Sequence, residues 1–295
     1  MISKSLSPLK FFSALAILLF CANDAFSKPR LNPITSFDRL WFEWNLIPAT
    51  QWSPRLIDSD ARPDRTLQIF KIQPVISYQL NKNFTFLTRS IFRFTSSPTA
   101  TPVLGFSQYG LPNISHWDQK YKSGLSDISP SAFLVPNLGP DWTLGLGASM
   151  AIPAADLPTN SGKLSLGPAF LAYYHRGPWT IGARMRNIWS VAGDPSRKNI
   201  NNFIAQPLVR YQLNKKWYFT SSPIISADWT KAKDEGWTVP VGGGLGYTFK
   251  IAKQPTQISI EAYYNAIKPS LAGEELLGDW TIRTQLQILF PRRAK

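Results

Sequence analysis

Hydrophobic and polar side chains alternate with period two along most of the chain. In the C-terminal segment 279–290, Trp280 and Phe290 fall on one face, while Arg283 and Gln285 fall on the other. Such alternation is typical of a β-strand with one face toward an apolar phase. At a tilt of about 45°, the spacing of the two aromatic residues corresponds to roughly 25 Å along a membrane normal. The segment therefore has the height of the apolar band of a membrane-spanning barrel.

The same aromatic spacing recurs elsewhere, at Phe84 and Phe94, and at Trp179 and Trp189. Segments of alternating polarity are separated by turn-forming residues, and the connections alternate between short and long. We expect about twelve strands, an even number that returns both ends to one side of a membrane. The predicted strands span residues 37–49, 66–80, 84–95, 124–136, 142–153, 163–174, 179–191, 201–213, 217–230, 237–251, 256–267 and 279–290.

These patterns predict an all-β fold, a transmembrane antiparallel β-barrel of outer-membrane type. No apolar run after the N-terminal region is long enough for a helical span, and a barrel needs none. Residues 96–122 are expected to form a long loop. The alternative is a soluble β-sandwich, which would not need aromatic girdle spacing on strand after strand.

The N-terminal residues have the features of a secretory signal. A basic start precedes the apolar run 11–20, and Ala25 and Ser27 supply small residues at the positions that signal peptidase inspects. We expect a signal peptide over 1–27 and a barrel domain over 28–295. The single cysteine lies in the signal, so the mature chain would have none, which suits an oxidising periplasm. The alternative, a retained helical anchor, is disfavoured because the run is too short to span.

The formal net charge of +14 is spread over loops, turns and alternate strand positions. Nucleic-acid binding would need basic residues on one face or in one arm, so we expect no nucleic-acid partner. The expected partners are outer-membrane lipids and lipopolysaccharide, a small-molecule solute, and the barrel assembly machinery through the C-terminal strand. Loop cations that could meet lipopolysaccharide phosphates, or simply be solvated, are Arg55, Arg62, Arg65, Arg197, Lys198, Lys231 and Lys233.

If the apolar faces meet lipid, the opposite faces line the interior, where cationic groups outnumber acids. Such a lumen would favour anionic or polarisable solutes; the alternative is a set of salt bridges that brace the wall. The lumen-lining candidates are Arg89, Arg93, Arg184, Arg186, Arg210, Asp228, Glu261 and Arg283, and the wider inward set adds Glu43, Lys71 and Asp127. Inward glycines, such as Gly242, Gly244 and Gly246, would leave the lumen open or allow the wall to bend.

Catalytic chemistry has little support in the sequence. An outer-membrane phospholipase needs a histidine held beside a serine nucleophile. His116 is expected in the long loop and His175 at a turn, neither in such a motif. No metal-ligand spacing or phosphate-binding loop is present either. We therefore expect no enzyme, no cofactor and no metal.

Several segments resemble the outer-membrane β-barrel family named for the meta-pathway of phenol degradation. They include IQPVISYQLNKNF at 72–84, GLSDISPSAFL at 124–134, GPWTIGARMRNIWSVAGD at 177–194, WTVPVGGGLG at 237–246 and the final strand. The resemblance implies uptake of small aromatic or hydrophobic compounds across the outer membrane of a Gram-negative bacterium. It carries no functional residues with it. We predict a monomeric or weakly oligomeric passive channel; the alternative is a closed structural or adhesin-like barrel whose loops bind lipopolysaccharide or a partner.

Overall fold

The structure, a computed structural model, describes residues 32, 34–49, 65–106, 112–154, 161–232, 235–271, 274–275 and 277–291. None of these residues belongs to a helix long and apolar enough to cross a membrane. The strands are β1 (Phe37–Ala49), β2 (Arg65–Gln79), β3 (Phe84–Phe106), β4 (Pro112–Leu125), β5 (Ser129–Pro136), β6 (Trp142–Ala151), β7 (Lys163–Arg176), β8 (Trp179–Gly193), β9 (Asn201–Gln212), β10 (Trp217–Ser221), β11 (Ile225–Asp228), β12 (Trp237–Ile251), β13 (Gln254–Ile267), β14 (Ser270–Leu271), β15 (Glu274–Glu275) and β16 (Trp280–Pro291).

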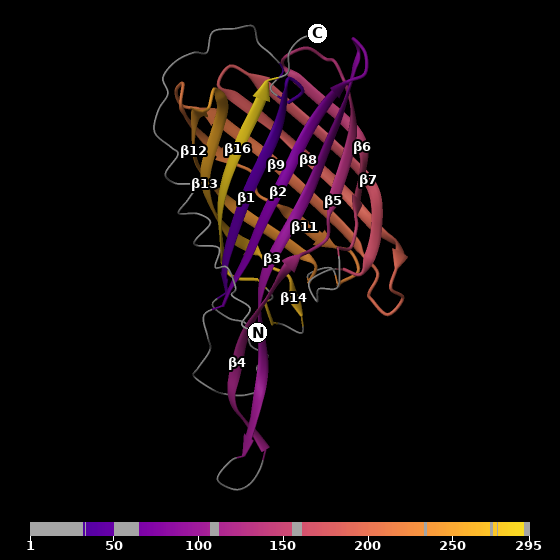
Figure 1. Cartoon of the computed structure of the whole chain (residues 1–295), viewed down its shortest axis with the longest axis vertical. Helices are drawn as coiled ribbons and strands as arrows, with labels where there is room; N and C mark the ends of the chain where they lie inside the picture. The colour runs from indigo at the N-terminus through magenta and orange to yellow at the C-terminus, as the bar shows by residue number, and fades with distance from the viewer. Residues whose placement is uncertain are drawn as a thin grey trace.

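The strands close into one antiparallel barrel (Figure 1). Its wall has twelve strand positions. Neighbours in sequence pair with each other, and β16 closes the wall by pairing with both β1 and β13. The short strands β10 and β11 together occupy one strand position of the wall, because both pair with β9 and β12. The strand β4 is not part of this closed wall and pairs only with β3. The predicted fold class is confirmed.

The aromatic side chains form two outward girdles. At the short-turn end, rings meet between neighbouring strands at centroid distances of 4.6 Å for Trp179 and Tyr211 and 4.7 Å for Trp142 and Tyr174. At the opposite end Tyr264 meets Trp280 at 5.4 Å. Aromatic residues prefer the membrane interface, where one end of the ring is apolar and the other wet. The girdles therefore mark the two edges of the apolar band.

Between the girdles the exterior is apolar and the interior polar. Ile181 and Leu146 are 46% and 68% exposed on the outer surface, whereas Glu43 and Arg283 are almost completely buried inside. In a water-soluble protein such apolar exposure would be unfavourable, but hydrocarbon favours it. The predicted orientation of the two strand faces is thus confirmed.

Asparagine side chains cap the β2–β3 and β9–β10 turns. Asn81 Oδ1 accepts hydrogen bonds from the backbone N–H groups of Asn83 and Phe84, and Asn214 Oδ1 accepts from those of Lys216 and Trp217. A side chain that caps its own turn fixes where one strand ends and the next begins. These turns lie where the sequence predicts them.

The prediction of a long loop over residues 96–122 is wrong. The strand β3 runs on to Phe106 and β4 starts at Pro112, and the two pair as a hairpin that projects beyond the barrel (Figure 1). Pro98 and Pro102 lie in β3, although proline cannot donate to a ladder. In a two-stranded hairpin each strand keeps one unpaired edge, so prolines are tolerated there.

The predicted strand 217–230 is interrupted. Its first part is β10 and its second is β11, with Ser222, Pro223 and Ile224 between them. Proline has no N–H to give to the ladder, and here it marks the break in the wall. A similar interruption separates β4 from β5 within the predicted strand 124–136.

Part of the interior is filled by an apolar cluster, which the sequence analysis did not predict. Its buried members come from β2, β3, β5 and β7, and the partly buried Ile34 and Tyr173 pack against it. Asn32 fixes the segment before β1 to this side, because its Nδ2 donates to the backbone oxygens of Gly139 and Trp142. The cluster consists of Val75, Leu87, Phe133, Val135, Ala169 and Leu171.

Candidate functional site in the barrel interior

Glu43 on β1 is the acceptor at the centre of one buried polar group. Lys71 Nζ lies 2.5 Å from Glu43 Oε1, which also accepts from Asn45 Nδ2 at 2.9 Å. Its other oxygen, Oε2, accepts from Gln285 Nε2 at 3.2 Å and Gln73 Nε2 at 3.3 Å. A carboxylate surrounded by a cation and three amide donors is fully compensated.

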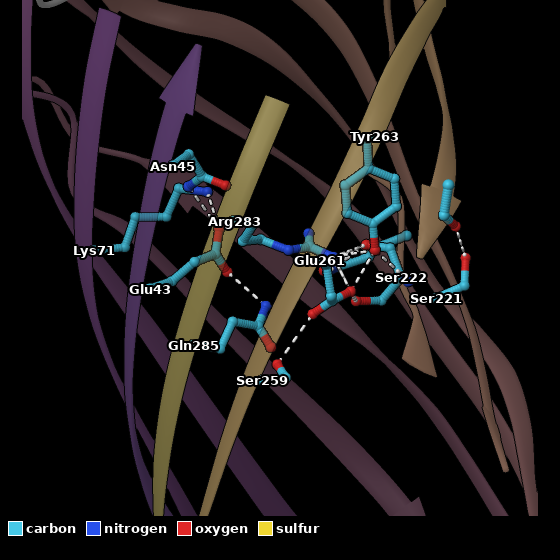
Figure 2. Close-up of polar contacts among 12 residues, drawn as sticks. Glu43, Asn45, Lys71, Ser221, Ser222, Ser259, Glu261, Tyr263, Arg283 and Gln285 are labelled. Carbon is cyan, nitrogen blue, oxygen red and sulfur yellow. Dashed lines mark hydrogen bonds and ion pairs between the residues drawn. The ribbon is translucent and has the colours of Figure 1, made fainter. Parts of the chain in front are cut away.

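Glu261 on β13 is the acceptor of a second buried group (Figure 2). Arg283 Nη2 on β16 lies 2.7 Å from Glu261 Oε2 and also donates to the Tyr263 hydroxyl at 2.6 Å. The Tyr263 hydroxyl in turn donates to Glu261 Oε2, and Ser259 Oγ donates to Glu261 Oε1 at 3.2 Å. Both charged side chains are at least 98% buried. This pair survives burial because the hydrogen bonds complete it.

The two groups lie side by side on the wall. In the strand register Ser259 is opposite Gln285, Gln285 is opposite Glu43, and Glu43 is opposite Lys71. They therefore form one continuous belt over β13, β16, β1 and β2, which we call the paired belt. Its acids are Glu43 and Glu261 and its cations are Lys71 and Arg283.

Ser222, which lies between β10 and β11, contacts the paired belt across β12. The Ser222 backbone oxygen and Oγ each accept from Arg283 Nη2 at 2.8 Å, although β12 and β13 stand between Ser222 and β16. The strand β12, which lies between them, carries several glycines. A Cβ atom at Gly244 would lie 1.9 Å from the Ile260 backbone oxygen, so no other residue fits there without movement of the wall.

A cavity of about 330 Å³ lies in the interior toward the short-turn end. None of the described residues that line it is an aspartate or a glutamate, whereas three are arginines and five are glutamines. We call it the arginine cavity. Its walls contain Arg39, Arg184, Arg210, Gln206, Gln212, Gln257, Gln285, Gln287, Trp41, Tyr173, His175, Thr180, Leu208, Tyr218 and Leu289, with Ile34, Phe37, Thr220, Ser222 and Ser259.

Neutral partners hold two of these arginines in place. Arg184 Nη2 donates to Gln206 Oε1, and Arg210 Nη1 donates to Gln257 Oε1 at 2.9 Å. The Arg210 guanidinium lies 3.6 Å from the centroid of the Tyr218 ring, a cation–π contact. Glutamine and tyrosine orient these guanidinium groups but do not neutralise them.

Further arginines extend the positive region. Arg186 Nη1 donates to Ser149 Oγ at 2.9 Å, and Arg89 Nη2 donates to Gln73 Oε1. The like charges of Arg184 and Arg186 act on Arg89, and that of Arg93 acts on Arg186, although β3 and β8 are not neighbours. Asp127 provides a counter-charge to Arg93.

The structure divides the eight predicted lumen residues into three sets. Arg89, Arg93, Arg184, Arg186 and Arg210 belong to the positive region, and Glu261 and Arg283 to the paired belt. Asp228 instead caps a connection at the rim, since its Oδ1 accepts from Thr230 Oγ1 at 2.6 Å and Thr230 N at 3.0 Å.

Asp194 caps the β8–β9 connection similarly, and the hydrogen bonds from Ser196 lower the pKa of its carboxyl.

Two of the residues that line the arginine cavity without having been predicted to do so are His175 and Gln287. His175, expected at a turn, lies near the end of β7 with its Nδ1 3.2 Å from Thr180 Oγ1. Continuing the inward alternation of residues 163–173 by one more step would have identified it. His175 Nε2 and Gln287 Nε2 are both buried without a hydrogen-bond partner among the described residues.

Metal chemistry receives no support from the described part of the chain, where no three His, Cys, Asp or Glu side chains lie together. His116 falls in β4, in a part of the hairpin whose side chains are not described.

Neither a protein-family model nor a curated protein sequence matches the chain. Among solved structures, its fold is similar to that of an outer-membrane channel from Pseudomonas putida F1, with a TM-score of 0.58 and 13% identity over 92% of this chain and 100% of that chain. The NanC porin gives a TM-score of 0.47 and 11% identity over 86% and 100%. The CymD monoaromatic hydrocarbon channel gives 0.46 and 9% over 89% and 90%. At these identities the similarity concerns the fold, and the first structure supports the outer-membrane barrel architecture.

Proposed function

We propose that this chain is an outer-membrane channel for the passive uptake of small solutes, aromatic compounds among them, and that its lumen favours anions. The observation that carries the proposal is the unequal distribution of charge inside the barrel. The acids Glu43 and Glu261 form ion pairs with Lys71 and Arg283, which neutralise them. Arg184 and Arg210 instead face a cavity with no described acid on its wall.

The physical argument is electrostatic focusing. Arginine remains charged at any physiological pH, so a cavity that it lines holds a lasting positive potential. A narrow path between low-dielectric walls concentrates the field and raises the local concentration of anions. The glutamines add hydrogen bonds that replace part of the hydration of a passing solute.

Planar bilayers test the proposal directly. The purified barrel should give discrete channel events, and a salt gradient should give a reversal potential of the sign expected for anions. Arg184→Gln and Arg186→Gln should each shift that potential toward cation permeation, because each removes a cation from the path. Arg197→Gln removes the same charge from the exposed β8–β9 connection and serves as the matched control. Unchanged selectivity in both interior variants would remove these arginines from the path.

The second candidate is a closed structural or adhesin-like barrel. The apolar cluster narrows the interior and the β3–β4 hairpin extends beyond the wall, and both features suit such a role. Absence of channel events and of liposome swelling, together with binding of the folded barrel to lipopolysaccharide, would favour it.

The remaining predictions are part of the proposal. They are residence in the outer membrane, recognition by the assembly machinery through β16, absence of catalysis, and membership in the family named for the meta-pathway of phenol degradation. The signal peptide at 1–27, Arg55, Arg62 and Lys233 lie outside the described residues, and the Arg65 side chain is not described. N-terminal sequencing of the exported protein would test cleavage after Ser27.

A further inference from the structure

We infer that the arginine cavity is a binding station for a small carboxylate with a flat apolar body, centred on Arg210. This inference rests on the proposed channel function and goes beyond it. A channel needs only a path, whereas a station holds the solute in a defined pose. The residues around Arg210 supply the three elements of such a pose: a fixed cation, hydrogen-bond donors without partners, and a flat surface.

The fixed cation is Arg210 itself. Its guanidinium is held from one side by Gln257 Oε1 and from another by the face of Tyr218. The Tyr218 ring lies over Gly246, where a Cβ atom would be only 2.0 Å from Tyr218 Cζ. The ring thus has one defined place, and Arg210 is oriented before a solute arrives. An oriented guanidinium loses less freedom on binding a carboxylate than a flexible one.

The donor without a partner is Gln287 Nε2. Gln287 is 7% exposed, lines the arginine cavity and has no partner for this nitrogen among the described residues. In the strand register Gln287 is opposite Gln257, the residue that holds Arg210. A buried amide N–H that lacks an acceptor is unfavourable, and a bound carboxylate oxygen would satisfy it.

A second buried nitrogen without a described partner belongs to a residue that lines the same cavity. His175 is 9% exposed, and its Nε2 has no described partner while its Nδ1 contacts Thr180 Oγ1. Thr180 is opposite Arg210 in the register of β8 and β9. Arg210, Gln287 and His175 therefore face the same cavity from three separate strands of the barrel wall.

The flat surface is Trp41. It lines the arginine cavity and is opposite Gln287 in the register of β1 and β16. Leu208 and Leu289 line the same cavity, so the wall around the donors is apolar. The volume of about 330 Å³ falls at the lower end of the range for small-molecule sites. An aryl carboxylate combines the charge and the flat body that these residues match.

Calorimetry on the purified barrel in detergent tests the inference with three probes. Benzoate has both features, benzamide has the ring without the charge, and acetate has the charge without the ring. Benzoate should bind, and the other two should bind at least about 10-fold more weakly, because each forfeits one set of contacts. Acetate binding as tightly as benzoate would overturn the inference in favour of general attraction for anions.

Variants locate the site. Arg210→Gln should weaken benzoate binding by about 10- to 100-fold, and Gln287→Leu by about 5- to 10-fold, as expected for a charged and a neutral hydrogen bond. Arg210→Lys keeps the charge but loses the planar fork, so it should restore only part of the affinity. Arg197→Gln should leave binding unchanged. Full restoration by lysine, or undiminished binding in Arg210→Gln, would contradict a defined pose.

Conductance measured on the same preparations separates this inference from the proposed function. Channel events without benzoate binding would refute the station and leave the channel intact. Benzoate binding without channel events would do the reverse. Heat-modifiable migration in gels would show that each variant is folded before either measurement is interpreted.

Discussion

The paired belt and the arginine cavity place the same residue type in opposite situations. Arg283 is buried against Glu261, Tyr263 and Ser222, and its charge is neutralised. Among the described residues, Arg210 is held by Gln257 and the Tyr218 ring, neither of which carries a charge to neutralise it. Both arginines sit at inward positions of regular strands. An arginine therefore braces the wall where an acid lies on an adjacent strand, and provides a positive surface to the lumen where only amides and aromatic rings are in reach.

This difference has an energetic consequence. A buried pair contributes little net stability when formed, yet removing one member leaves the other charge uncompensated. An arginine in contact with amides and solvent leaves no such charge behind. Stability should thus depend on the belt, whereas selectivity should depend on the cavity.

The largest expected effect is on the belt. Arg283→Gln leaves the Glu261 carboxylate without its cation, and the free energy of unfolding should fall by about 3–5 kcal/mol. Urea unfolding in phospholipid vesicles measures it. Combining Arg283→Met with Glu261→Leu should recover most of the loss, because no charge remains buried. A single-variant loss below about 1 kcal/mol would show that the belt does not depend on this pair.

Crowding the contact between β12 and β10 should have an intermediate effect. Gly246→Ala places a methyl group where the Tyr218 ring now lies, which should lower the free energy of unfolding by about 1–3 kcal/mol. The same vesicle assay measures the change. In a Tyr218→Leu background the added methyl should be nearly neutral, because the ring is absent. Equal losses in both backgrounds would mean that the ring is not the obstacle.

The cavity should respond in the opposite way to the belt. Arg184→Gln should change the free energy of unfolding by less than about 1 kcal/mol, since the lost bond to Gln206 is offset by relief of repulsion with Arg89. Its effect should appear in the reversal potential instead. A loss as large as that of Arg283→Gln would remove the distinction between the two regions.

The smallest effect is expected at the rim. Asp228→Ala removes the two hydrogen bonds to Thr230, which should lower the free energy of unfolding by about 0.5–1 kcal/mol and leave the reversal potential unchanged. Asp228→Asn retains an acceptor and should lose less. A shift in reversal potential as large as that of Arg184→Gln would instead place Asp228 on the solute path.

Much of the fold could be predicted because its signals are local. Alternation with period two identifies strands, aromatic residues mark where strands leave the apolar band, and Asn81 and Asn214 fix turns by hydrogen bonds within three residues. The β3–β4 hairpin could not be predicted in this way. Its prolines are unfavourable in a sheet, and only the pairing of β3 with β4 shows that an unpaired edge is available for them.

The sequence by itself determined the barrel, the outward apolar surface and the excess of cations at inward positions. It could not determine which arginine meets an acid, because that depends on register and on contacts between strands that are not neighbours. Arg283 reaches Ser222 across β12, which carries glycines between them, and among the described residues Arg210 donates to the Gln257 amide and not to an acid. Closure of the sheet brings these residues together, so the division of the interior into a neutral belt and a positive cavity was decided by tertiary structure.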